Sequence, residues 1–73
     1  MNPGTLCSVR QGAPLFPESW KKGQQPINID ATTTGIVLDS KQEPDTFEPR
    51  TFYQVSTRYG VGWVNSTFCM EIK

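Results

Sequence analysis

Six prolines and six glycines divide this 73-residue chain into short segments, and no segment repeats its apolar residues at the spacing of a helix. The segments are rich in Val, Ile, Thr, Tyr and Phe, which are the residues enriched in β-strands. Five or six short strands in a chain of this length predict an all-β fold. We expect a small barrel in a single domain spanning residues 1–73, because closing a sheet removes its exposed edges.

Five segments have the composition of main strands. They are residues 5–10, 33–39, 51–58, 61–64 and 69–72. Alternation of side chains along a strand places Cys7 and Val9 on one face of the first strand, and Tyr53, Val55 and Thr57 on one face of the third. The nearly continuous apolar run 35–38 predicts that the second strand is covered on both faces.

The segments between these strands are predicted to be turns and loops. Residues 11–30 and 40–49 are polar and proline-containing, so we expect two long loops, with one short strand around Ile27 and Ile29. Tyr59 and Gly60 are expected to form a tight turn in which Gly60 takes a positive φ. Residues 65–68 are expected to form a 3₁₀ turn, capped by Asn65 or Ser66.

The two cysteines lie near opposite ends of the sequence. A disulfide between them would tie the two ends together. The alternative is two reduced thiols, which we favour because cytosolic proteins rarely keep disulfides. If Met70 and Ile72 point inward in the last strand, Cys69 points outward while Cys7 points inward, so the thiols are expected on opposite faces.

The stretch from Phe52 to Phe68 contains a Tyr-x-Val strand, a tight turn, a Gly-Trp-Val strand and a 3₁₀ turn that ends in a hydrophobic residue. This order resembles the C-terminal half of bacterial SH3-like domains. The opening Pro3–Val9, the run Gly35–Val37 and the tail Glu71-Ile72 are similar to short SH3-like proteins of tailed bacteriophages.

The resemblance implies a small SH3-like barrel of five to six short antiparallel strands, with a long first loop and a 3₁₀ turn before the last strand. Both loops are longer than a minimal barrel needs. Cell-wall-binding relatives are usually exported or joined to a hydrolase, so peptidoglycan binding does not carry over. The positions expected to determine the fold are Val9, Gly35, Val37, Tyr53, Val55, Gly60, Gly62, Val64, Phe68, Met70 and Ile72.

The charges and residue types argue against several function classes. Seven basic and seven acidic residues balance, so the chain lacks the positive footprint that a phosphate backbone selects. The sequence has no histidine, the commonest general base and metal ligand, and no nucleophile with a base beside it. We expect no enzymatic activity, no cofactor and no metal. The acidic residues 39–48 are either a weak Ca²⁺ site or a solvated loop, and their spacing matches no known Ca²⁺ loop.

Aromatic residues are the strongest contact candidates. Phe16 and Trp20 lie in the first long loop, Arg58 at the end of the third predicted strand, Tyr59 in the predicted turn, and Trp63 on a strand. In SH3-like folds such residues can line a groove for an extended peptide. Alternatively, Trp63 and Tyr53 fill the barrel and Trp20 covers one open end. The pair Lys21–Lys22 beside Trp20 could bind nucleic acid by stacking and charge, but a solvated loop is the simpler interpretation.

These observations predict a non-enzymatic protein–protein interaction module, a small phage-encoded accessory or minor virion structural protein. One alternative is a phage factor that binds and modulates a host protein, in counter-defence or takeover. Another is a KOW-like nucleic-acid binder. The partner is expected to be a phage structural or host protein, and the sequence leaves homo-oligomerisation open. No apolar run reaches the ~20 residues that span a bilayer and no secretory signal opens the sequence, so we expect it in the host cytoplasm or the assembled virion.

Overall fold

The computed structural model describes residues 1–17, 25–43 and 50–72. Its elements in chain order are β1 (Leu6–Val9), β2 (Pro14–Leu15), β3 (Ile27–Asn28), β4 (Thr33–Glu43), β5 (Arg50–Thr57), β6 (Gly60–Asn65), the 3₁₀ helix η1 (Ser66–Phe68) and β7 (Cys69–Glu71). The predicted all-β barrel with a 3₁₀ turn before the last strand is confirmed. The described residues hold seven strands rather than five or six, because two-residue strands form within the predicted first loop.

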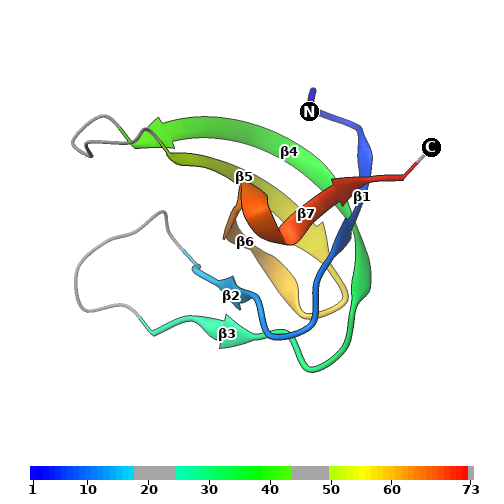
Figure 1. Ribbon diagram of the computed structural model, residues 1–73, viewed down its shortest axis with the longest axis vertical. Coiled ribbons are helices and arrows are strands. Elements are labelled where there is room, and N and C mark those ends of the chain that lie inside the picture. The colour runs from blue at the N-terminus through cyan, green and yellow to red at the C-terminus, as the bar shows by residue number, and fades with distance from the viewer. Residues whose placement is uncertain (18–24, 44–49, 73) are drawn as a thin grey trace.

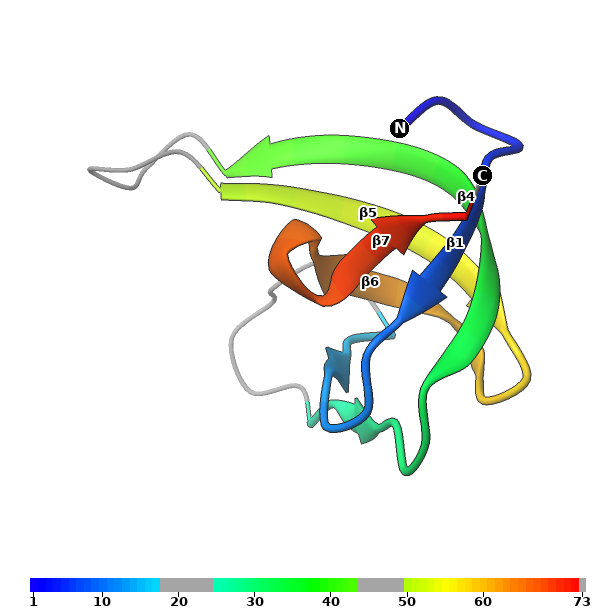
Figure 2. The ribbon, with the colours of Figure 1, turned by 45° about the vertical axis from the view of Figure 1, so that its right-hand side comes forward.

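Five antiparallel strands form the main sheet in the order β6-β5-β4-β1-β7, and β2 and β3 form a separate two-stranded ribbon (Figure 1). The 11-residue β4 connects the two halves of the barrel, because its first residues pair with β1 while most of its length pairs with β5. The register with β5 shifts between Val37 and Asp39. Such a bulge bends a strand and increases its twist, and β4 curves along its length (Figure 2).

The core lies on the inner face of this bent sheet. Its fully buried side chains are Cys7, Val9, Ala13, Leu15, Ile29, Val37, Val55 and Val64. Cys7 and Val9 point inward as predicted. Tyr53 and Phe68 are partly buried and pack against the same cluster, so each of the barrel's main strands contributes to one small core.

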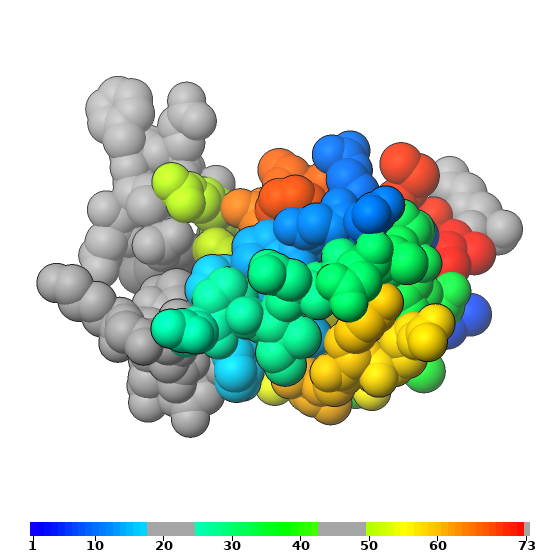
Figure 3. All heavy atoms as spheres, turned by 90° about the horizontal axis from the view of Figure 1, so that it is seen from below, coloured from blue at the N-terminus to red at the C-terminus, as the bar shows by residue number. Residues whose placement is uncertain are grey.

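Of the predicted first loop, the described part includes β2 and β3, which lie along the lower side of the barrel in Figure 1 and face the viewer in Figure 3. Phe16 and Trp63 donate backbone hydrogen bonds to each other's carbonyl, at 2.9 and 2.7 Å, which attaches the end of β2 to the edge of β6. A Cβ placed on Gly62 would lie 2.6 Å from the Phe16 carbonyl oxygen and 2.8 Å from Leu15 Cγ. Position 62 therefore needs glycine for β2 to approach β6.

The tight turn lies one residue earlier than predicted, while Gly60 has the predicted positive φ and the 3₁₀ turn falls within the predicted residues 65–68. A two-residue turn, Arg58–Tyr59, joins β5 to β6, and Gly60 follows it with a φ of 124°. The Thr57 hydroxyl accepts a hydrogen bond from Tyr59 N and donates one to Gly60 O. At η1, the Asn65 side chain accepts a hydrogen bond from Thr67 N at 3.0 Å, so Asn65 is the cap.

The predicted orientation of the last strand is wrong. Cys69 pairs with Val9 and therefore shares its inner face, whereas Met70 pairs with Ser8 on the outside and is 72% exposed. Ile72 is exposed as well. The phase follows from η1, because Arg10 N donates to Phe68 O and fixes how β7 begins.

The prediction that residues 35–38 are covered on both faces is also wrong. Val37 is fully buried, but Ile36 and Leu38, its neighbours on β4, are each 44% exposed. The apolar run therefore arises because both faces of β4 are apolar here. In the described part of the chain, only the inner face is fully buried.

Candidate functional site

Two of the predicted contact residues, Phe16 and Trp63, lie together at the β6 edge. Side chains of paired residues share a face of the sheet, and the pairing puts Phe16, Trp63 and Phe52 on the face opposite to Val64. Lys41, paired with Phe52, places its Nζ 6.0 Å from the Trp63 ring centroid, within reach of a cation–π contact. Trp63 is only 9% exposed and Phe52 6%, so they offer little free surface to a partner.

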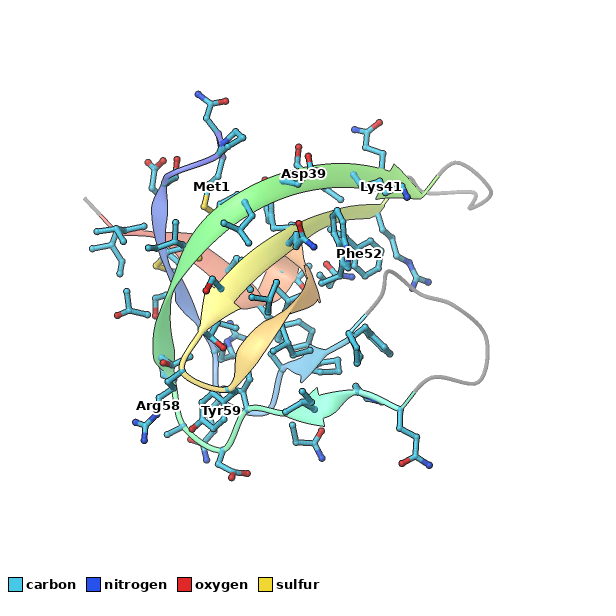
Figure 4. All side chains as sticks on the ribbon, turned by 180° about the vertical axis from the view of Figure 1, so that it is seen from behind. Met1, Asp39, Lys41, Phe52, Arg58 and Tyr59 are labelled. Atoms are coloured by element: carbon cyan, nitrogen blue, oxygen red, sulfur yellow. The ribbon has the colours of Figure 1, made fainter. Side chains whose placement is uncertain are left out.

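Arg58 and Tyr59 lie at the opposite end of β5 from Phe52 and Lys41 (Figure 4). The Arg58 guanidinium carbon is 5.5 Å from the centroid of the Tyr59 ring, and Tyr59 packs partly against the core. Trp20 and the Lys21–Lys22 pair lie outside the described residues. The structure therefore places the candidates in two separate pairs, Phe16 with Trp63 and Arg58 with Tyr59.

The two cysteines are neighbours, contrary to the prediction that they lie on opposite faces. Cys69 pairs with Val9, and Cys7 is two residues before Val9 on the same face of β1. Both are free, and their thiols are hydrogen-bonded to each other. Burial raises the pKa of Cys7, and burial together with the proximity of Cys7 raises the pKa of Cys69 to about 12. Because the thiolate is the reactive form, both thiols are poor nucleophiles at neutral pH.

A row of exposed apolar side chains lies on the outside of the main sheet, and the sequence does not predict it. One row of paired residues crosses all five strands, with Ile72 opposite Leu6, Leu6 opposite Ile36, Ile36 opposite Ser56, and Ser56 opposite Val61. Met70 and Leu38 flank this row. We call the large apolar side chains of this surface the outer face: Leu6, Ile36, Leu38, Val61, Met70 and Ile72.

The outer face is apolar and uncharged across its width. Its six side chains are 44–72% exposed, and the small polar residues interspersed in the pairing register are Ser8, Thr34 and Ser56. Among the described residues, the charged positions around it are Arg10, after the end of β1, Asp39, after the bulge, and Arg58, in the β5–β6 turn. Glu71 lies between Met70 and Ile72 but pairs with Cys7, so it belongs to the opposite side of the strand. An interface core is likewise depleted in charged residues.

The hollow and the acidic residues of the described surface are weaker candidates for a binding site. A hollow of about 160 Å³ beside Met70, lined also by Ser8, Arg10 and Phe68, is smaller than typical ligand pockets. Asp39 accepts a hydrogen bond from Ser40 N at 2.8 Å. Residues 1–17, 25–43 and 50–72 contain no cluster of three or more potential metal ligands, and the acidic residues 45 and 48 lie outside them.

Comparison of the chain with protein-family models, curated proteins and solved structures gives no match. The relationship to bacterial and phage SH3-like proteins therefore stays a prediction based on the sequence motifs. In the described part of the chain, no helix is long and apolar enough to cross a membrane.

Proposed function

We propose that this protein is a non-enzymatic protein–protein interaction module that binds its partner through the outer face. The observation that carries the proposal is the row of exposed apolar side chains across the main sheet, from Val61 through Ile36 and Leu6 to Ile72. An antiparallel sheet with one solvated face normally alternates apolar with polar residues. Here β4 carries apolar residues on both faces between positions 36 and 38.

The free energy of burial favours this assignment. Fully burying one large aliphatic side chain contributes roughly 1.5–3 kcal/mol, and the six residues of the outer face are each about half exposed or more. Single exposed apolar residues need no explanation, whereas the largest apolar patch on a small protein, roughly 300–600 Å², is often functional, and this supports the proposal. Covering this patch would also stabilise the barrel, because a chain of this length has a small core.

The aromatic pairs support a secondary role in the same module. Tyr59 with Arg58 keeps partial exposure at the β5–β6 turn, and aromatic and arginine side chains are common anchors at interfaces. Trp63 contributes mainly through packing, since little of it is exposed. The setting that we propose, a phage-encoded accessory or minor virion protein, is supported by the sequence resemblance alone, as is the alternative of a factor that binds a host protein.

Thiol labelling in the producing cell tests the proposed function without a known partner. Thr34 is exposed, and it lies opposite Ser8, beside Leu6 and Ile36. In a Thr34→Cys variant, we expect a maleimide to label dilute purified protein readily and the protein in intact cells poorly. Asn28→Cys, exposed on β3 outside the outer face, is the matched control and should label in both settings. Equal labelling of the Thr34→Cys thiol in both settings would contradict the proposal.

A further inference from the structure

We infer that the occupant of the outer face is a second copy of this chain, so that the protein forms a symmetric dimer with the β1–β4–β7 part of the sheet at its centre. This inference rests on the proposed function and names the partner of the same surface. It is carried by the position, area and charge of the outer face.

The position of the outer face suits a two-fold interface. Leu6 is on β1, the strand between β4 and β7, with Ile36 opposite it on one side and Ile72 on the other. Met70 lies in the next row, opposite Ser8. A two-fold interface places the same patch of both subunits in contact, so the patch must complement itself. Aliphatic side chains interspersed with serine and threonine meet this requirement.

The area is what one side of a stable interface needs. From their exposed fractions of 44–72%, the six side chains expose on the order of 550 Å² of mainly apolar surface. A standard interface buries roughly 800 Å² on each partner, of which a little over half is apolar. One outer face therefore supplies the apolar content of one side, and a second copy supplies the other.

The charges favour a second copy over a charged partner. The charged side chains that border the apolar row are Arg10, beside the hollow at Met70, and Asp39, next to Leu38. In a contact between two outer faces they would lie at the rim, while the central row of Leu6, Ile36 and Ile72 carries no charge. An unpaired charge in the interface would be costly. The chain as a whole carries seven basic and seven acidic residues, so two copies do not repel each other at long range.

Analytical ultracentrifugation of the purified protein tests the inference. We expect the wild type to sediment as a monomer–dimer equilibrium with a dissociation constant in the micromolar range. Leu6→Lys places a charge at the centre of the interface and should weaken the dimer at least about tenfold, and Leu6→Ser should weaken it less. The matched control is Ile27→Lys, because Ile27 is 40% exposed on β3, outside the outer face, and this change should leave the equilibrium unaltered.

Circular dichroism shows whether each variant is folded, and Leu6→Ser decides the test if Leu6→Lys unfolds. A wild type that stays monomeric at all concentrations would overturn the inference, as would a dimer that Leu6→Lys and Ile27→Lys weaken equally or not at all. A monomeric wild type whose Thr34→Cys thiol is still protected in cells would leave the interaction module standing with a different partner. An unprotected thiol in cells would overturn the proposed function itself.

Discussion

The two faces of the β1–β4 pair differ in burial although they hardly differ in hydrophobicity. Cys7, Val9 and Val37 on the inner face are fully buried, whereas Leu6 and Ile36, on the same strands, are 48% and 44% exposed. The difference arises because β2 and the remaining strands pack against the inner face alone. Apolar character alone therefore does not show which face of a strand is buried, and on this pair of strands the packing of the barrel decides it.

The largest expected difference in stability is between a substitution in the core and a substitution on the outer face. Leu15→Ala removes a fully buried side chain from the core and should lower the free energy of unfolding by about 2–5 kcal/mol. Leu6→Ala, on the outer face, should change it by less than about 1 kcal/mol at a protein concentration that favours the monomer. Urea denaturation of both variants measures the difference, and equal losses would show that the outer face is part of the folding core.

A smaller effect is expected where β2 closes the inner face. Gly62→Ala would place its Cβ 2.6 Å from the Phe16 carbonyl oxygen, so the backbone must move and the cost should be about 1–3 kcal/mol. In Gly35→Ala the closest atoms are the Thr57 side-chain Cγ2 at 3.1 Å and the Ser56 carbonyl oxygen at 3.3 Å, and because both contacts are longer than those at Gly62 the cost should be lower. Thermal denaturation of the two variants gives this order, and the reverse order would contradict the role of β2 as a closing strand.

We expect the Cys69 thiol to make stability depend on pH. The effect should be smaller than the losses expected from the core substitutions, because Cys69 is partly exposed to solvent. Folding raises the pKa of Cys69 from 9.0 to about 12, so the folded state holds its proton more tightly than the unfolded chain does. The resulting stabilisation is complete below pH 9 and is lost as the pH rises toward 12. Between pH 9 and 12, the free energy of unfolding should fall more steeply in the wild type than in Cys69→Ser. Parallel pH profiles of the two proteins would contradict this prediction.

The smallest effect is expected at the surface of the β5–β6 turn. Arg58→Gln removes the cation from beside the Tyr59 ring, 5.5 Å away, and should cost about 0.5–1 kcal/mol, as for an exposed cation–π pair. Tyr59→Leu keeps apolar bulk but removes the aromatic face, and a double-mutant cycle with Arg58→Gln isolates the contact. A coupling energy indistinguishable from zero would show that the two side chains act independently.

Local features of this fold could be predicted from the sequence, whereas features set by long-range packing could not. Gly60 and Asn65 predict their turn and cap because glycine and asparagine act on the adjacent backbone. The phase of β7 depends on a hydrogen bond between Arg10 and Phe68, which are far apart in sequence. An error of one residue in that phase reverses every side chain of the strand.

The same reason explains which candidate site residues were missed. The sequence predicts that Ile36 and Leu38 lie in a strand covered on both faces, because a continuous apolar run is typical of buried strands. Aromatic residues are common interface anchors and are therefore the predicted contacts, yet Trp63 is largely buried. The outer face is indicated by apolar residues that point outward from neighbouring strands. These residues lie side by side only when the strands are paired in the correct register, which the sequence does not give.

The most direct test of the account compares two adjacent residues of β4. Ile36→Lys places a charge on the outer face, and we predict a folded protein whose free energy of unfolding, measured with the protein dilute, falls by no more than about 1 kcal/mol. Val37→Lys places the charge in the core, where it has no partner, and we predict that the barrel does not fold. If Ile36→Lys unfolds the barrel as completely as Val37→Lys does, the outer face is required for folding and its assignment as a contact surface is contradicted.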